Sequence, residues 1–137
     1  MKAKVKWIED GLFLGTSESG HHILLDTDNS KSAPCPLEAI LISLGSCSSV
    51  DVMGILKKSK QQVSACSVEI SGTLVSEVPK LFSKIHLHFI ITGSNIKMQH
   101  AERAIRLSTT KYCSVALMLN GKVEISSDFL IINECIQ

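Results

Sequence analysis

The chain has 137 residues, of which 45% are hydrophobic, 20% are charged and 4% are aromatic, and its formal net charge is +1. This length predicts a single domain over residues 1–137, large enough to bury a core without disulfide bonds. Because the chain has no basic excess and few aromatic side chains, we expect it to have no nucleic-acid partner.

The N-terminal quarter of the chain has the alternating pattern of a small antiparallel sheet. In the first segment Ala3, Val5 and Trp7 share one face and lysines occupy the other, which predicts a half-exposed strand. The expected elements are strands at Met1–Trp7, Leu12–Thr16 and His21–Asp26, followed by a polar loop at Thr27–Ser32. Strands joined by turns this short predict an antiparallel meander.

A long helix is predicted from Leu37 to about Lys60, since this segment is too long for a strand and has no turn signal. Its first half is almost entirely apolar or small, which is typical of a helix buried on most sides. The longest uncharged apolar run, Ala39–Val50, is shorter than the roughly 20 residues of a membrane span. At the N-terminus lysines alternate with apolar residues, whereas a signal peptide has a continuous apolar run after a short basic stretch. We therefore expect a cytoplasmic protein with no membrane partner.

The C-terminal half of the chain alternates between strand and helix patterns. The expected elements are strands at Ser64–Val75 and Phe82–Thr92, helices at Lys97–Tyr112 and Cys113–Leu119, and a strand at Val123–Ile132. In the second strand, Ile85, Leu87, Phe89 and Ile91 point inward, whereas His86 and His88 lie on the face expected to be solvated. The whole order of elements predicts an α+β fold.

Five cysteines are scattered along the chain without a C-x-x-C pair, so zinc-ribbon and thioredoxin motifs are not supported. In a reducing compartment such thiols are either inert core residues or reactive groups. Cys66 is expected in the core, Cys35 between two prolines is expected to be exposed, and Cys135 near the end is expected to be incidental.

Two cysteines are candidates for chemistry. Cys47 lies on the long helix among small residues, which allow another backbone segment or a substrate to approach the helix closely. Asp51 lies one turn later on the same side of the helix. Cys113 would begin a new helix, whose free N–H groups and dipole would lower its pKa. For both residues the pattern alone leaves a structural cysteine as the alternative.

Around these two cysteines the sequence resembles the OsmC/Ohr superfamily (osmotically inducible protein C and organic hydroperoxide resistance proteins). The segment Pro36–Cys47 resembles the cysteine-bearing helix of that family, and Tyr112–Leu117 resembles its second cysteine segment. The order of elements and the length also agree. Val5–Trp7 and Lys111–Leu119 look most like the YhfA-like branch.

The resemblance implies an α+β fold in which antiparallel sheets wrap around a long buried central helix, as an intertwined homodimer. It also implies a peroxidase activity that reduces organic hydroperoxides in oxidative stress defence. Cys47 would match the peroxidatic cysteine and Cys113 the resolving cysteine, with Glu38 or Asp51 tuning the site electrostatically. A dithiol or lipoyl-type reductant would restore the thiols. No metal or organic cofactor is implied.

Two departures from the peroxidase members favour a second reading. Those members use an N-terminal arginine, whereas this chain has no arginine before Arg103. Their glutamate stands one position earlier, where this chain has Leu37 before Glu38. The alternative is a non-peroxidatic OsmC-like protein that binds a small apolar ligand or senses redox state at the dimer interface. A structural dimer with inert thiols is a third possibility.

Overall fold

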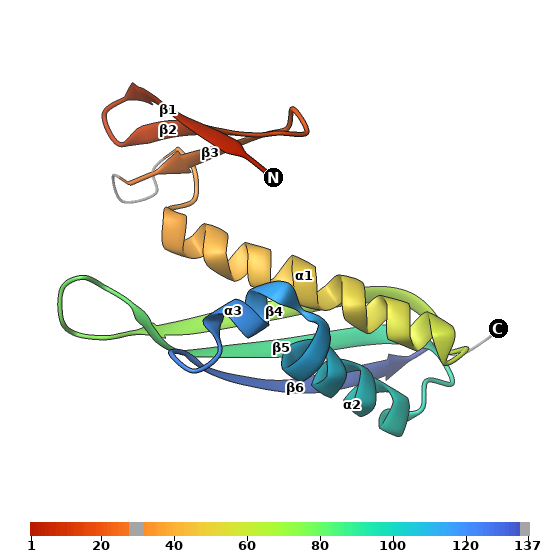
Figure 1. The fold of residues 1–137 in the computed structure, drawn as a ribbon. Coiled ribbons are helices and arrows are strands. Elements are labelled where there is room, and N and C mark those ends of the chain that lie inside the picture. The colour runs from red at the N-terminus through yellow and green to blue at the C-terminus, as the bar shows by residue number, and fades with distance from the viewer. Residues whose placement is uncertain (28–31, 135–137) are drawn as a thin grey trace. The chain divides into compact units, whose positions relative to one another are not determined.

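The computed structural model describes residues 1–27 and 32–134, and the chain forms two compact units, residues 1–40 and residues 41 onward. The N-terminal unit contains the three strands β1 (Ala3–Glu9), β2 (Leu12–Ser17) and β3 (His22–Asp26). They pair in the order β1-β2-β3, each antiparallel to its neighbour, which confirms the predicted meander (Figure 1).

Both faces of β1 are exposed within the N-terminal unit. Val5 is 64% exposed and Trp7 is 62% exposed, although they lie on the apolar face that was expected to be covered. A three-stranded sheet has no second layer of its own to bury such a face. Of the predicted loop, residues 28–31 lie outside the described part of the chain.

The long helix α1 (Pro36–Lys58) confirms the predicted central helix, and it ends two residues earlier than expected. Lys60 adopts a left-handed conformation with φ 58°. The N–H of Gln61 then donates to the carbonyl of Leu56 at 3.0 Å, which is a Schellman-type C-cap. This turn satisfies carbonyl groups at the end of the helix and redirects the chain into the next strand.

In the C-terminal unit α1 buries one face. Its buried residues are Leu44, Gly45, Ser48, Val52 and Leu56. By contrast, Ile42 is 58% exposed and Val50 is 72% exposed. The helix α1 is long and apolar enough to cross a membrane, but the core helix of a globular domain can have the same length and composition. In this structure α1 packs against a sheet. Burial of its remaining apolar surface stays a prediction that depends on a partner.

The sheet of the C-terminal unit consists of β4 (Gln62–Leu74), β5 (Phe82–Ser94) and β6 (Glu124–Asn133), in the order β4-β5-β6. The first pair is antiparallel, whereas β5 and β6 are parallel. The α+β fold is confirmed, but this one pair of strands differs from the antiparallel sheets that the resemblance implied. The reason is that α2 (Met98–Leu107) and α3 (Ser114–Leu119) carry the chain back between the two strands, as a parallel pairing requires.

The core of this unit lies between the sheet and the helices. The four inward residues predicted on β5 are completely buried, which confirms the period-2 pattern: Ile85, Leu87, Phe89 and Ile91. Helices α1 and α2 lie over this face of the sheet (Figure 1). A Cβ at Gly45 would overlap the Cδ1 of Ile70 and lie 3.2 Å from Val68 Cγ1. The small residue therefore allows the close helix–sheet approach that positions Cys47 two residues later.

The segment between α2 and α3 differs from the predicted continuous helix to Tyr112. After Leu107 the chain widens into one π-helical turn, η1 (Ser108–Tyr112). The backbone N–H of Cys113 donates to the carbonyl of Ser108 at 2.8 Å, which spans five residues instead of four. Such turns are frequent at functional sites. Here the turn connects two residues of the cluster described next.

Candidate functional site

Three of the four predicted site residues come together in the C-terminal unit. The sulfurs of Cys47 and Cys113 and a carboxylate oxygen of Asp51 all lie within 4.8 Å of one another. Cys47 and Asp51 are one turn apart on α1, so that they share a face, and Cys113 is the N-cap of α3. Packing of α1 beside η1 and α3 thus brings together two thiols that are far apart in the sequence.

Hydrogen bonds hold the Cys113 sulfur in place. The Ser48 hydroxyl donates to it at 3.3 Å, and the backbone N–H of Ala116 donates to it at 3.4 Å. Cys113 is completely buried, whereas Cys47 is half-buried. Of the two thiols, Cys47 is therefore the one that a solute can reach.

Burial raises the pKa of the Cys113 thiol. The hydrogen bonds from Ser48 and Ala116 lower this pKa, but by less, and the hydrogen bond and electrostatic interaction with Cys47 raise it further. The predicted helix start at Cys113 is confirmed, but the expectation of a lowered pKa is wrong. The penalty for burying the charge exceeds the stabilisation that the nearby donors supply.

Ser108 completes the polar cluster. Its hydroxyl lies 3.1 Å from the carbonyl oxygen of Ser48 and 3.3 Å from Oδ2 of Asp51, so that it can donate to either. Both serines are completely buried. Sequence reasoning missed Ser48 and Ser108 as site residues. The small-residue segment around Cys47 pointed to the first, but the π turn that places the second has no recognisable pattern.

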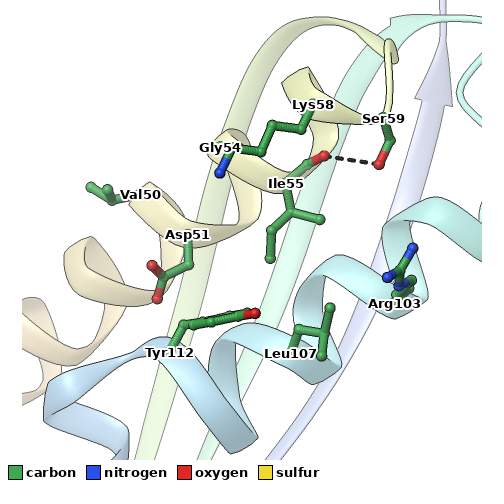
Figure 2. Close-up of a pocket in the computed structure, with 9 residues that line it drawn as sticks. All are labelled: Val50, Asp51, Gly54, Ile55, Lys58, Ser59, Arg103, Leu107 and Tyr112. Carbon is green, nitrogen blue, oxygen red and sulfur yellow. Dashed lines mark hydrogen bonds between the residues drawn. The ribbon is translucent and has the colours of Figure 1, made fainter.

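A cleft of about 480 Å³ opens beside Asp51. Figure 2 shows that α1 supplies one wall of the cleft and that α2 and η1 supply the other. Its charged residues are Asp51, Lys58 and Arg103, and its larger apolar side chains are Ile55, Leu107 and Tyr112. Sequence reasoning did not assign Lys58, Arg103 or Tyr112 to the site, because they come from different elements.

Glu38 belongs to the N-terminal unit, where its carboxylate accepts the backbone N–H of Cys35 at 2.8 Å. Among the described residues, the acidic member of the cluster is Asp51. Cys66 packs against the core as predicted, and burial raises its pKa. Cys35 is half-buried rather than exposed, and Cys135 lies outside the described residues.

His86 and His88 form a separate surface pair on β5. Both contact Oδ1 of Asp128 on β6, at 3.0 Å and 2.6 Å respectively. The hydrogen bond from His88 and, to a smaller extent, that from His86 lower the pKa of the Asp128 carboxyl. This arrangement agrees with the expectation of a solvated polar face.

We expect the free energy of unfolding to fall as the pH rises above about 9. The folded protein retains the Cys113 proton at pH values where the unfolded chain has released it. The contribution of Cys113 to the free energy of unfolding is therefore fully present below the pKa of the unfolded chain and declines above it. One such thiol contributes a slope of up to about 1.4 kcal/mol per pH unit. Urea unfolding across this range should show a shallower slope for Cys113→Ser than for the wild type. Equal slopes would contradict the raised pKa.

Comparisons with known proteins agree on one family. The family model described as "OsmC-like protein" matches residues 27–128, which include the whole cluster. Protein YhfA of Escherichia coli (strain K12) is 46% identical over 132 residues, which cover 96% of this chain and 98% of that protein.

Solved structures share the fold. A hypothetical protein from Aquifex aeolicus VF5 is 28% identical, with a TM-score of 0.88 and coverage of 98% of this chain and 97% of that chain. An organic hydroperoxide resistance protein OsmC from Legionella pneumophila is 16% identical, with a TM-score of 0.71 and coverage of 97% and 96%. The second likeness is one of fold alone.

Proposed function

Because this chain belongs to the OsmC-like protein family, we propose that it is a thiol-dependent peroxidase that reduces organic hydroperoxides in the cytoplasm, as part of oxidative stress defence. The observation that carries the proposal is the separation of the Cys47 and Cys113 sulfurs, which lie within 4.8 Å of each other. A disulfide has an S–S length of about 2.05 Å. Small movements of the two side chains and of the backbone can bring the sulfurs from their present separation to this bond length.

Cys47 is the nucleophile in this proposal, because it is half-buried whereas Cys113 is completely buried. The Cys47 thiolate attacks the distal oxygen of the hydroperoxide and breaks the O–O bond. The sulfur is oxidised to sulfenic acid, and the alkoxide takes up a proton and leaves as the alcohol.

Cys113 then resolves the sulfenic acid. Its sulfur forms the disulfide with Cys47 and displaces the sulfenic oxygen, which leaves as water after taking up the Cys113 proton. The raised pKa of Cys113 keeps that proton available near neutral pH. A dithiol or lipoyl-type reductant returns both cysteines to thiols and is itself oxidised to a disulfide.

Asp51 is proposed to tune the proton transfers, since its carboxylate lies within 4.8 Å of both sulfurs and accepts from Ser108. Glu38 remains a proposed electrostatic group on the evidence of its place in the cysteine helix. The apolar part of the hydroperoxide would lie in the cleft, against Ile55 and Leu107. Arg103 also lines this cleft.

We also propose a homodimer. Apolar side chains are exposed on α1, such as Ile42 and Val50, and on the N-terminal sheet, such as Val5 and Trp7. Exposed apolar surface of this extent indicates an interaction site. Sedimentation equilibrium should give twice the mass of the chain, and a monomer at micromolar concentration would contradict the proposal.

Stopped-flow kinetics with cumene hydroperoxide and dithiothreitol test the proposed activity. The reduced protein should consume hydroperoxide catalytically, with the alcohol as the product and one Cys47–Cys113 disulfide per chain in the oxidised form. Peptide mapping identifies that disulfide. No turnover above the reductant alone, at any tested hydroperoxide, would overturn the proposal.

A second candidate function is the binding of a small ligand without peroxidase turnover. The cleft of about 480 Å³ favours it, because this volume falls within the usual range of small-molecule sites. Native mass spectrometry of the purified protein would then show a copurified small molecule, which a substitution such as Leu107→Trp in the cleft wall should displace. An empty cleft combined with hydroperoxide turnover would exclude this candidate.

A further inference from the structure

The three residues of the cluster are also a ligand set for a metal ion. Thiolates and carboxylates are ligands of Zn²⁺, and sites with three protein ligands leave a fourth position open. We propose that the reduced protein binds one Zn²⁺ per chain through Cys47 Sγ, Cys113 Sγ and the Asp51 carboxylate. The inference concerns the same thiols as the proposed function but does not require turnover of hydroperoxide.

The spacing of the three donor atoms fits this ion after a small adjustment. Two sulfurs bound to a tetrahedral Zn²⁺ at about 2.3 Å lie about 3.8 Å apart. The donor atoms of the cluster lie within 4.8 Å of one another, so that the two sulfurs have to approach each other by no more than about 1 Å. Cys47 and Asp51 are one turn apart on the same helix, which fixes their relative position.

The surrounding hydrogen bonds suit bound ligands. The Ser48 hydroxyl and the Ala116 N–H donate to Cys113 Sγ, and the Ser108 hydroxyl can donate to Asp51 Oδ2. Donors of this kind orient metal-bound thiolates and carboxylates and compensate part of their charge. They leave other lone pairs of the same atoms available to the ion.

Charge balance also favours a cation. Two thiolates and a carboxylate carry three negative charges, and Cys113 is completely buried, so that its ionisation without a partner is costly. Binding releases the two thiol protons and oxidises nothing. The mixed sulfur and oxygen donors favour Zn²⁺ over the harder Mg²⁺ and Ca²⁺. Because Asp51 also lines the cleft, water can supply the fourth ligand.

Metal binding and disulfide formation exclude each other in this site, because both use the same two sulfurs. Zn²⁺ therefore protects the thiols from oxidation, and oxidation to the disulfide releases the ion. The ion is an inhibitor of the redox reaction and not a cofactor for it.

The test is a titration of the reduced, tag-free full chain with Co²⁺ and then Zn²⁺ in the absence of peroxide. We expect one Co²⁺ per chain, with a thiolate-to-cobalt absorption band and tetrahedral d–d bands, both lost when Zn²⁺ is added. Cys47→Ser and Cys113→Ser should weaken Zn²⁺ binding more than about 100-fold, and Ser108→Ala should weaken it about 10-fold. Cys66→Ser is the matched control, since it removes another half-buried thiol outside the cluster.

Wild-type protein oxidised with diamide keeps the test independent of the folding of any variant, and it should bind no Zn²⁺ at this site. Equal Zn²⁺ binding by reduced and oxidised protein, or by wild type and Cys47→Ser, would overturn the inference. So would full retention of binding by Cys113→Ser. A protein that binds Zn²⁺ but does not turn over hydroperoxide would leave the inference standing and remove the proposed function.

Discussion

Replacing Cys47 with serine is expected to lower kcat/KM for cumene hydroperoxide by at least about 10³-fold, to the rate of the reductant alone. A serine hydroxyl is not ionised near neutral pH, whereas the attacking group in the proposed reaction is a thiolate. Serine differs from cysteine by a single atom, so that the half-buried position on α1 should tolerate it. Stopped-flow kinetics under pseudo-first-order conditions measure the loss directly.

Cys66→Ser is the control for this experiment, because Cys66 is half-buried on β4 and is not part of the cluster. It should retain the wild-type kcat/KM. Turnover by Cys47→Ser equal to that of the wild type would end the assignment of the nucleophile. If Cys113→Ser lost turnover while Cys47→Ser retained it, Cys113 would be the nucleophile and Cys47 the resolving cysteine.

Replacing Cys113 with serine is expected to abolish the disulfide and to leave the first oxidation step intact. One equivalent of hydroperoxide should convert Cys47 to a sulfenic acid that persists and forms a dimedone adduct. Excess hydroperoxide should then inactivate this variant at least about 10-fold faster than the wild type, because no thiol competes with oxidation to the sulfinic acid. Intact mass and peptide mapping distinguish these products.

The serine at position 113 can still receive the hydrogen bonds from Ser48 and Ala116, so we expect the fold to be retained. Thermal unfolding checks this independently of activity. A disulfide of normal yield in the variant would show that another cysteine resolves Cys47. Peptide mapping of the oxidised variant would then identify that cysteine.

The local patterns of the sequence predicted the elements well where one physical rule dominated. Alternation on β5 predicted the four buried side chains, because a strand between a helix layer and solvent must alternate. The long apolar run predicted α1, and only the left-handed turn at Lys60 moved its end. The helix predicted to Tyr112 extended beyond the observed end of α2 at Leu107, because the residues of the π turn that follows have no pattern that distinguishes them from an α-helix.

The sequence predicted contacts between distant segments less well than it predicted individual helices and strands. The parallel pairing of β5 and β6 depends on the path of the helices between them, which no strand pattern records. The missing cover over β1 depends on what packs against it, and not on β1 itself. Both features follow from connections and partners rather than from the residues of the strand.

The sequence by itself determined the family resemblance, the α+β class, the central helix and the pairing of Cys47 with Cys113 as candidates. Only the tertiary structure decided that their sulfurs meet within 4.8 Å, that Asp51 joins them, and that Ser48 and Ser108 complete the cluster. It also reversed the expected pKa shift of Cys113. The physical reason is that residue types and periodicity specify local conformation, whereas burial and donor distances arise only when separate elements pack together.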